Sequence, residues 1–124
     1  MRLIIAGTRT LEVNNEFITQ CLRMTDIDKG ITSVVCGMAP GMDECGRQWA
    51  ISKKIPVDEF PADWKGLSKS AGMVRNKQMA DNGDALLLIW TGDEKKSPGS
   101  AGMKALMLKQ NKPIYEVILK AYNT

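Results

Sequence analysis

Apolar residues along this chain gather in short continuous runs, and the longer segments between the runs carry apolar residues at helical spacing. A short continuous apolar run is typical of a strand that is buried on both faces of a sheet. The run at residues 85–90 is the most strongly apolar, so we expect it in the middle of the sheet. The strands predicted in this way are residues 2–6, 31–36, 56–60, 85–90 and 113–118.

The segments between these strands predict helices. Phe17, Ile18, Cys21 and Leu22, for example, form one apolar stripe along a helix. The polar stretch at residues 65–70 predicts a loop instead. The predicted helices are residues 14–24, 41–54, 71–82 and 99–111.

The order of these elements predicts the fold class. Strands that alternate with helices at this spacing form βαβ units, which build a parallel sheet. The 124 residues are 44% hydrophobic and 25% charged, as is ordinary for a single globular domain. We therefore predict one α/β domain over residues 1–124, with three layers: a mainly parallel five-stranded sheet and helices on both of its faces.

Residue usage excludes several functional classes. The longest apolar run is far shorter than the roughly 20 residues needed to cross a bilayer, and the run before Gly7 is too short for a signal peptide. Three cysteines without CxxC spacing predict reduced core thiols, so we expect a soluble cytoplasmic protein. The chain has no histidine, which removes His-based nucleophiles and His-ligated zinc; no metal site is expected.

The charge pattern favours a small anionic ligand. The net charge is +3, and the lysines are scattered along the chain rather than massed in one block. A nucleic-acid interface usually needs a more concentrated basic patch. A mildly basic surface still attracts small anions.

Polar and glycine-rich segments follow the predicted strands. In an open parallel sheet, ligands bind beyond the carboxyl ends of the strands. We therefore expect a binding site where four such segments meet. They are Gly7-Thr8-Arg9, residues 37–41, Asp63-Trp64 and residues 91–100.

The segment from Gly37 to Asp43 connects a strand to a helix through two glycines. Such a turn offers backbone N–H groups and a helix N-terminus to an anion, or it uses glycine only for tightness; both interpretations stay open. Met42-Asp43 stands where a Walker loop would need Lys and Ser or Thr. Asp43 is favourable as a helix cap, and it could instead accept a hydrogen bond from a ribose hydroxyl.

Arg75 and Asn76 lie near the start of a predicted helix, where a basic charge opposes the helix dipole. A bound anion would explain the arginine, which can form a bidentate pair. The alternatives are a solvated side chain or an ion pair with Asp63 or Asp81. Trp64 is either a lid that stacks on a base or a loop anchor in the core.

Other conspicuous side chains have a structural interpretation. Cys45 and Trp49 fall on the apolar face of their helix and are expected in the core. Met103 and Met107 are either an interface or ordinary core, and core is the favoured interpretation.

Taken together, these motifs resemble the SLOG superfamily of Rossmann-like domains, specifically its YspA/cpYpsA-related branch. The resemblance covers nearly the whole chain in the expected order. The matching motifs are Gly37-x-x-x-Gly41-x-Asp43, Trp49-Ala50, Phe60-Pro61-Ala62-Asp63-Trp64, Ala71-Gly72-x-x-Arg75-Asn76-x-x-Met79 and Ser97-x-Gly99-Ser100-x-x-Met103.

The resemblance implies a pocket for a nucleotide or a nucleotide-derived ligand, such as an ADP-ribose-like signal. It implies that no further cofactor is required, and that the protein assembles as a homo-oligomer, a dimer or a tetramer. Asp43 and Asp63 would face hydroxyls, and Trp64 would cover the base or wall the site. The ligand-binding residues expected on this basis are Gly7, Thr8, Arg9, Gly37, Met38, Gly41, Asp43, Asp63, Trp64, Arg75, Asn76, Gly99 and Ser100.

The same superfamily includes the LOG phosphoribohydrolases, which cleave the N-glycosidic bond of nucleoside monophosphates with an arginine and a glutamate. This chain departs from their Pro-Gly-Gly-x-Gly-Thr-x-x-Glu motif, because Leu106 or Met103, depending on the alignment, stands in place of the glutamate. Neither side chain can transfer a proton.

Three functional hypotheses follow. The first, favoured, is a binding protein that senses, carries or sequesters a nucleotide-derived molecule without catalysis. The second is a nucleosidase or phosphoribohydrolase that has recruited another carboxylate, such as Asp43, Asp63 or Asp93. The third is a protein associated with single-stranded nucleic acid.

Overall fold

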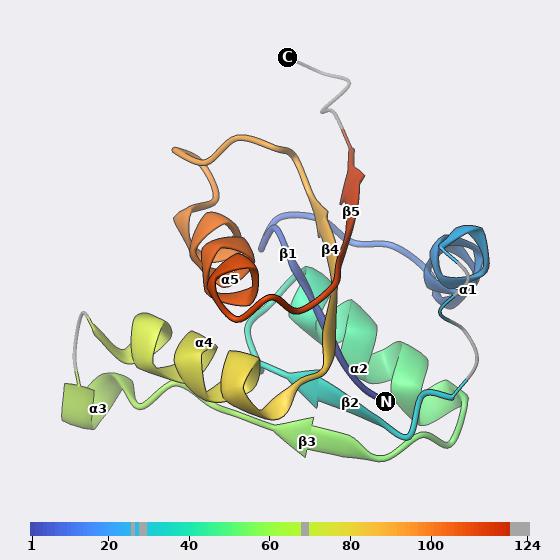
Figure 1. The fold of residues 1–124 in the computed structure, drawn as a ribbon, viewed down its shortest axis with the longest axis horizontal. Helices are drawn as coiled ribbons and strands as arrows, with labels where there is room; N and C mark the ends of the chain where they lie inside the picture. The colour runs from blue at the N-terminus through green and yellow to red at the C-terminus, as the bar shows by residue number, and fades with distance from the viewer. Residues whose placement is uncertain (26, 28–29, 68–69, 120–124) are drawn as a thin grey trace.

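The computed structural model describes residues 1–25, 27, 30–67 and 70–119 (Figure 1). Strands and helices alternate along the chain, as the apolar pattern predicts. The elements are β1 (Arg2–Gly7), α1 (Asn15–Met24), β2 (Ser33–Cys36), α2 (Met42–Ser52), β3 (Val57–Glu59), α3 (Trp64–Leu67), α4 (Ala71–Asn82), β4 (Ala85–Trp90), α5 (Pro98–Lys109) and β5 (Ile114–Ile118).

All five strands are parallel, and their order in the sheet is β3-β2-β1-β4-β5. The predicted α/β class and parallel sheet are therefore confirmed. β4 is buried along its whole length, but the central strand is β1, so the predicted place of residues 85–90 is wrong by one strand. Strong apolarity reports burial on both faces, which every interior strand has, and does not report rank in the sheet.

Helices cover both faces of the sheet. Alternate residues of β1 point to opposite sides, so Leu3 and Ile5 pack in one apolar cluster and Ile4 and Ala6 in another. The first cluster includes residues of α1 and α2, and the second includes residues of α4 and α5. Figure 1 shows these two helix layers on either side of the strands.

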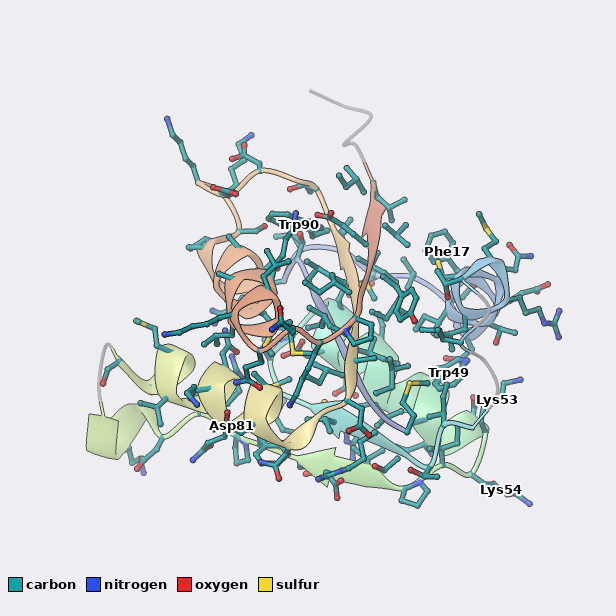
Figure 2. The ribbon with its side chains drawn as sticks, viewed as in Figure 1. Phe17, Trp49, Lys53, Lys54, Asp81 and Trp90 are labelled. Atoms are coloured by element: carbon teal, nitrogen blue, oxygen red, sulfur yellow. The ribbon has the colours of Figure 1, made fainter. Side chains whose placement is uncertain are left out.

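The side chains expected in the core are there. Trp49 is 4% exposed, and its indole N–H donates to the Thr19 hydroxyl at 3.0 Å (Figure 2). Met103 and Met107 are buried in the second cluster, which confirms their core interpretation. The three cysteines are free; Cys21 and Cys36 are buried, while Cys45 is half-buried against the first cluster.

One predicted loop is a helix. The short helix α3 covers residues 64–67, so it overlaps the first three residues of the loop predicted at 65–70. The Asp63 carboxylate accepts the Gly66 N–H at 2.9 Å, which caps this turn of helix. The remaining predicted elements are present, with ends that shift by one or two residues. In the described part of the chain, no helix has the length and apolarity needed to span a membrane.

Candidate functional site

A cavity of about 850 Å³ lies at the carboxyl ends of β1 and β4. These two strands are neighbours, but the chain leaves β1 toward β2 and leaves β4 toward β5. The strand order reverses between them, which is where open parallel sheets bind ligands. The cavity is lined by Ala6, Gly7, Thr8, Arg9, Thr10, Ala39, Asp43, Arg75, Asn76, Met79, Thr91, Asp93, Lys96, Ser97, Pro98, Gly99, Ser100 and Met103.

The cavity brings together most of the residues expected at a binding site, although they come from four separate segments. Those that line it are Gly7, Thr8, Arg9, Asp43, Arg75, Asn76, Gly99 and Ser100. Gly37, Met38, Gly41 and Asp63 are not part of the lining. The side chain of Trp64 lies outside the described residues, so its expected role as a lid stays a prediction.

Further residues line the cavity that the sequence does not single out one by one. From the sequence, Asp93 is a candidate only as a replacement catalytic carboxylate. The other residues of the loop after β4 are expected only as part of the segment 91–100. Met79 and Met103 belong to the matching motifs, but an apolar residue on a helix looks the same whether it faces core or cavity, so neither is expected individually in the lining. The lining residues missed in this way include Thr10, Ala39, Met79, Thr91, Lys96, Ser97, Pro98 and Met103.

Thr8 connects the elements around the cavity. It is 7% exposed, and its hydroxyl accepts the Thr91 N–H at 3.3 Å and lies 3.2 Å from the Ser97 hydroxyl. Its carbonyl oxygen accepts the N–H of Met42, the first residue of α2. One buried threonine therefore fixes the end of β1 against the end of β4 and the starts of two helices.

The first turn of α5 opens into the cavity. Pro98 is the first residue of the helix, and it has no N–H to satisfy. The Gly99 and Ser100 N–H groups belong to the first turn, where a helix offers donors and a partial positive charge. The position of a Gly99 Cβ would be open space. An anionic group can approach this end of the helix closely.

Arg75 lies in the wall formed by α4 and is 7% exposed, so the solvated interpretation is wrong. Its Nη1 donates to the Gly37 carbonyl oxygen, and its Nε donates to the Asn76 side-chain oxygen at 3.0 Å. Its Nη2 donates to no residue that the structure describes. Burial lowers the pKa of Arg75 and Asp43 raises it, but a guanidinium stays charged. Two edges of the guanidinium are fixed, and the third is available to a ligand.

The two alternative partners of Arg75 are engaged elsewhere. Asp81, in the last turn of α4 (Figure 2), accepts from Lys77 at 2.7 Å and from Gln110 at 2.8 Å. Asp63 is exposed and caps α3 through Gly66. Neither carboxylate forms an ion pair with Arg75.

Asp43 is a buried carboxylate in the cavity wall, with an exposed fraction of 7%. It lies in the first turn of α2, but its Oδ2 accepts the N–H of Ala39 at 3.2 Å, outside the helix. The helix-cap interpretation is therefore wrong: Asp43 closes the preceding loop. Burial raises the pKa of Asp43 to about 6, although the nearby charges of Arg75 and Arg9 lower it.

The glycine loop supports the cavity from behind. Gly41 has φ +77° and ψ −128°, and a Cβ there would lie 2.2 Å from the Arg9 carbonyl oxygen. A Cβ on Gly37 would lie 2.7 Å from Asp43 Oδ2 and 2.8 Å from Arg75 Nη1. Both glycines are therefore needed for close approach, as the tight-turn interpretation requires. Met38, between them, is 38% exposed.

The balance of charge in the cavity is positive. Arg9, Arg75 and Lys96 line it with two carboxylates, Asp43 and Asp93. Asp93 Oδ1 accepts the backbone N–H groups of Lys95 at 3.0 Å and Lys96 at 3.3 Å, so part of its charge is used locally. Within the described residues, no three acidic or cysteine side chains gather in a way that could hold a metal ion.

Comparison of the chain with protein-family models, with curated proteins and with solved structures finds no match. The chemistry of the cavity therefore rests on its own geometry. It offers helix N–H donors and cations to an anion, and a buried carboxylate to a hydrogen-bond donor, around one cavity.

Proposed function

We propose that this protein binds a nucleotide-derived small molecule, of the ADP-ribose type, as a sensor, carrier or sequestering protein. One observation carries the proposal: the open first turn of α5 and the free edge of the Arg75 guanidinium meet in one cavity at the switch point of the sheet. A helix N-terminus offers donors and a positive dipole end to phosphate, and an arginine fork can bind it in a bidentate manner.

The size of the cavity agrees with this ligand class. Small-molecule sites usually have volumes of about 300–1,000 Å³, and this cavity measures about 850 Å³. Its walls combine polar groups with the apolar side chains of Met79 and Met103. A nucleotide has the same mixture, because it joins phosphate and ribose to a flat, weakly polar base.

The side chains at the two positions that could replace the LOG glutamate support binding rather than catalysis. Met103 lines the cavity, and Leu106 is half-buried against the second apolar cluster. Neither can donate or accept a proton, so the reaction of the LOG enzymes lacks its acid or base at both positions.

A second candidate function rests on Asp43. A buried carboxyl whose pKa is raised to about 6 is suited to acid–base chemistry near neutral pH. In hydrolysis of a nucleoside monophosphate, water would add to the anomeric carbon and the C–N bond would break. Protonated Asp43 would supply the proton that the departing base needs.

Calorimetry with ADP-ribose, cyclic ADP-ribose isomers, NAD and AMP tests the first proposal. Lys95 and Lys96 provide a matched pair of variants, because both are exposed neighbours and only Lys96 lines the cavity. We expect Lys96→Ala to weaken binding about fivefold, or roughly 1 kcal/mol, and Lys95→Ala to leave it unchanged. Failure of all these molecules to bind the wild type, or equal loss in both variants, would overturn the proposal.

Two further assays separate the alternatives. Release of free base and ribose 5-phosphate from AMP, lost in Asp43→Asn, would establish the hydrolase. A steep salt dependence of binding to single-stranded oligonucleotides would favour the nucleic-acid hypothesis instead. We expect neither signal.

A further inference from the structure

Asp43 and Arg75 place opposite charges close to Gly37 and in the wall of the cavity. Each side chain is 7% exposed, and a Cβ on Gly37 would lie within 3 Å of both Asp43 Oδ2 and Arg75 Nη1. The two groups nevertheless form no direct ion pair; their nearer bonds go to Ala39 and Gly37. Each group is therefore anchored to the backbone of the glycine loop rather than to the other group.

Each member of the pair keeps one position without a partner. Neither Asp43 Oδ1 nor Arg75 Nη2 forms a hydrogen bond with a residue that the structure describes. Among those residues, Arg47 Nε is the side-chain polar atom that is sealed from solvent without a hydrogen bond, and it lies 3.6 Å from Glu59 Oε1. The free atoms of Asp43 and Arg75 are therefore not sealed from solvent, and both residues line the cavity, one offering an acceptor and one a donor.

We propose that Asp43 and Arg75 form a subsite for a ribose hydroxyl, which selects ribonucleotide ligands over their deoxy counterparts. A hydroxyl is the smallest group that can donate to Asp43 Oδ1 and accept from Arg75 Nη2 at the same time. This inference rests on the proposed function. It assigns the sugar to the part of the cavity wall formed by Asp43 and Arg75, and the phosphate to the first turn of α5.

A phosphate fits poorly beside Asp43 and Arg75. An ionised Asp43 would repel it, whereas the α5 N-terminus offers donors without a competing carboxylate beyond the locally engaged Asp93. Loss of the hydroxyl would leave two buried charged groups without their partner. Sites built in this way reject analogues that lack the hydroxyl much more strongly than apolar pockets reject a missing methylene.

Ionisation of Asp43 gives the subsite a recognisable pH dependence. The groups that face it are Arg75 from α4, Arg9 after β1, and the Cys36 thiol of β2, whose pKa burial raises to about 11 so that it stays neutral. Glu44 follows it in α2, and Glu59 of β3 lies near Cys36. The carboxyl group of Asp43 has a pKa of about 6, so it is ionised at pH 7.5 and mostly protonated at pH 5.

The experiment compares AMP and ADP-ribose with forms that lack a ribose hydroxyl, by calorimetry at pH 7.5 and pH 5. At pH 7.5 we expect the wild type to bind the hydroxyl-bearing form about 10- to 100-fold more tightly. The ratio should fall at pH 5, and in Asp43→Asn, which keeps only a neutral acceptor, it should be lower than in the wild type at pH 7.5 and should not change with pH. The wild-type pH series needs no variant to fold.

The outcomes separate the two proposals. Equal affinity of the wild type for ribo and deoxy forms would overturn the subsite while the proposed function stands. A ratio that stays the same or rises at pH 5 would also overturn it, because recognition of the hydroxyl would then not depend on the ionised form of Asp43. If no member of either series bound, both the proposed function and the subsite would be rejected.

Discussion

The guanidinium of Arg75, in α4, donates to the carbonyl oxygen of Gly37 at the end of β2. This bond ties a residue of the second half of the chain to the glycine loop of the first half. Arg75 also lines the cavity. Arg75 is therefore both a structural link and the expected anion-binding side chain, and its variants should show both effects.

Arg75→Lys should weaken binding of ADP-ribose about 10- to 100-fold, because an ammonium can keep one contact but cannot reproduce the fork. Calorimetry gives the affinity, and thermal unfolding shows whether the fold is retained. Lys77→Ala is the matched control on the same helix, since Lys77 is exposed and pairs with Asp81. An unchanged affinity in Arg75→Lys would contradict the role assigned to the guanidinium.

Gly41→Ala should lower the free energy of unfolding by about 3 kcal/mol or more. The added Cβ would meet the Arg9 backbone, and the backbone of Gly41 has a positive φ. Gly30→Ala separates the two causes, because Gly30 has φ +81° and open space around its missing Cβ. We expect that control to cost about 1 kcal/mol in urea unfolding. Equal losses would show that the contact with Arg9 does not matter.

Asp43→Asn should stabilise the ligand-free protein at pH 7.5. Burial raises the folded-state pKa of Asp43 above its usual 3.8 to about 6, so the folded protein holds this proton more tightly than the unfolded chain. The contribution of Asp43 to stability is therefore full below about pH 4 and is lost as the pH rises through 6. A gain of about 1–3 kcal/mol at pH 7.5, shrinking at pH 4, is the result expected from denaturant unfolding. A gain that does not depend on pH would point to another cause.

Thr8→Val should destabilise the protein by about 1–3 kcal/mol, since it removes the acceptor of the Thr91 N–H and the partner of the Ser97 hydroxyl. Thr8→Ser keeps the hydroxyl and should restore most of this loss. The valine variant should also bind AMP more weakly while binding of adenosine changes little, because Ser97 precedes the helix turn expected to hold phosphate. Thermal unfolding and calorimetry on the same two variants test both effects.

The fold could be predicted largely from the apolar pattern, because strands buried on both faces carry unmistakable runs such as Ala85–Trp90. Two details could not. The rank of that strand depends on which way each crossover turns, and the run itself carries no such information. The helix α3 depends on one capping bond from Asp63, in a stretch whose composition is typical of loops.

The residues of the candidate site likewise fall into those that the sequence identifies and those that only the structure explains. Gly99 is expected from the sequence only as part of the segment 91–100 and of the motif that resembles the SLOG superfamily. Arg75 stood out because a cation at a helix start opposes the helix dipole. Gly41 stood out equally, but its reason is the backbone of Arg9, which only the three-dimensional contact reveals. Ser97 belongs to one of the matching motifs, but its contact with Thr8, across 89 residues of sequence, is revealed only by the structure.

The strand order has a consequence for how binding depends on folding. β1, β2 and β3 come from the first half of the chain and β4 and β5 from the second, so the β1–β4 pair is a seam between two halves. The cavity lies across that seam, with Arg9 and Asp43 on one side and Arg75 and Gly99 on the other. Neither half holds a complete set of contacts. A bound ligand would contact both halves, so its binding free energy would stabilise the folded state and oppose separation of β1 from β4.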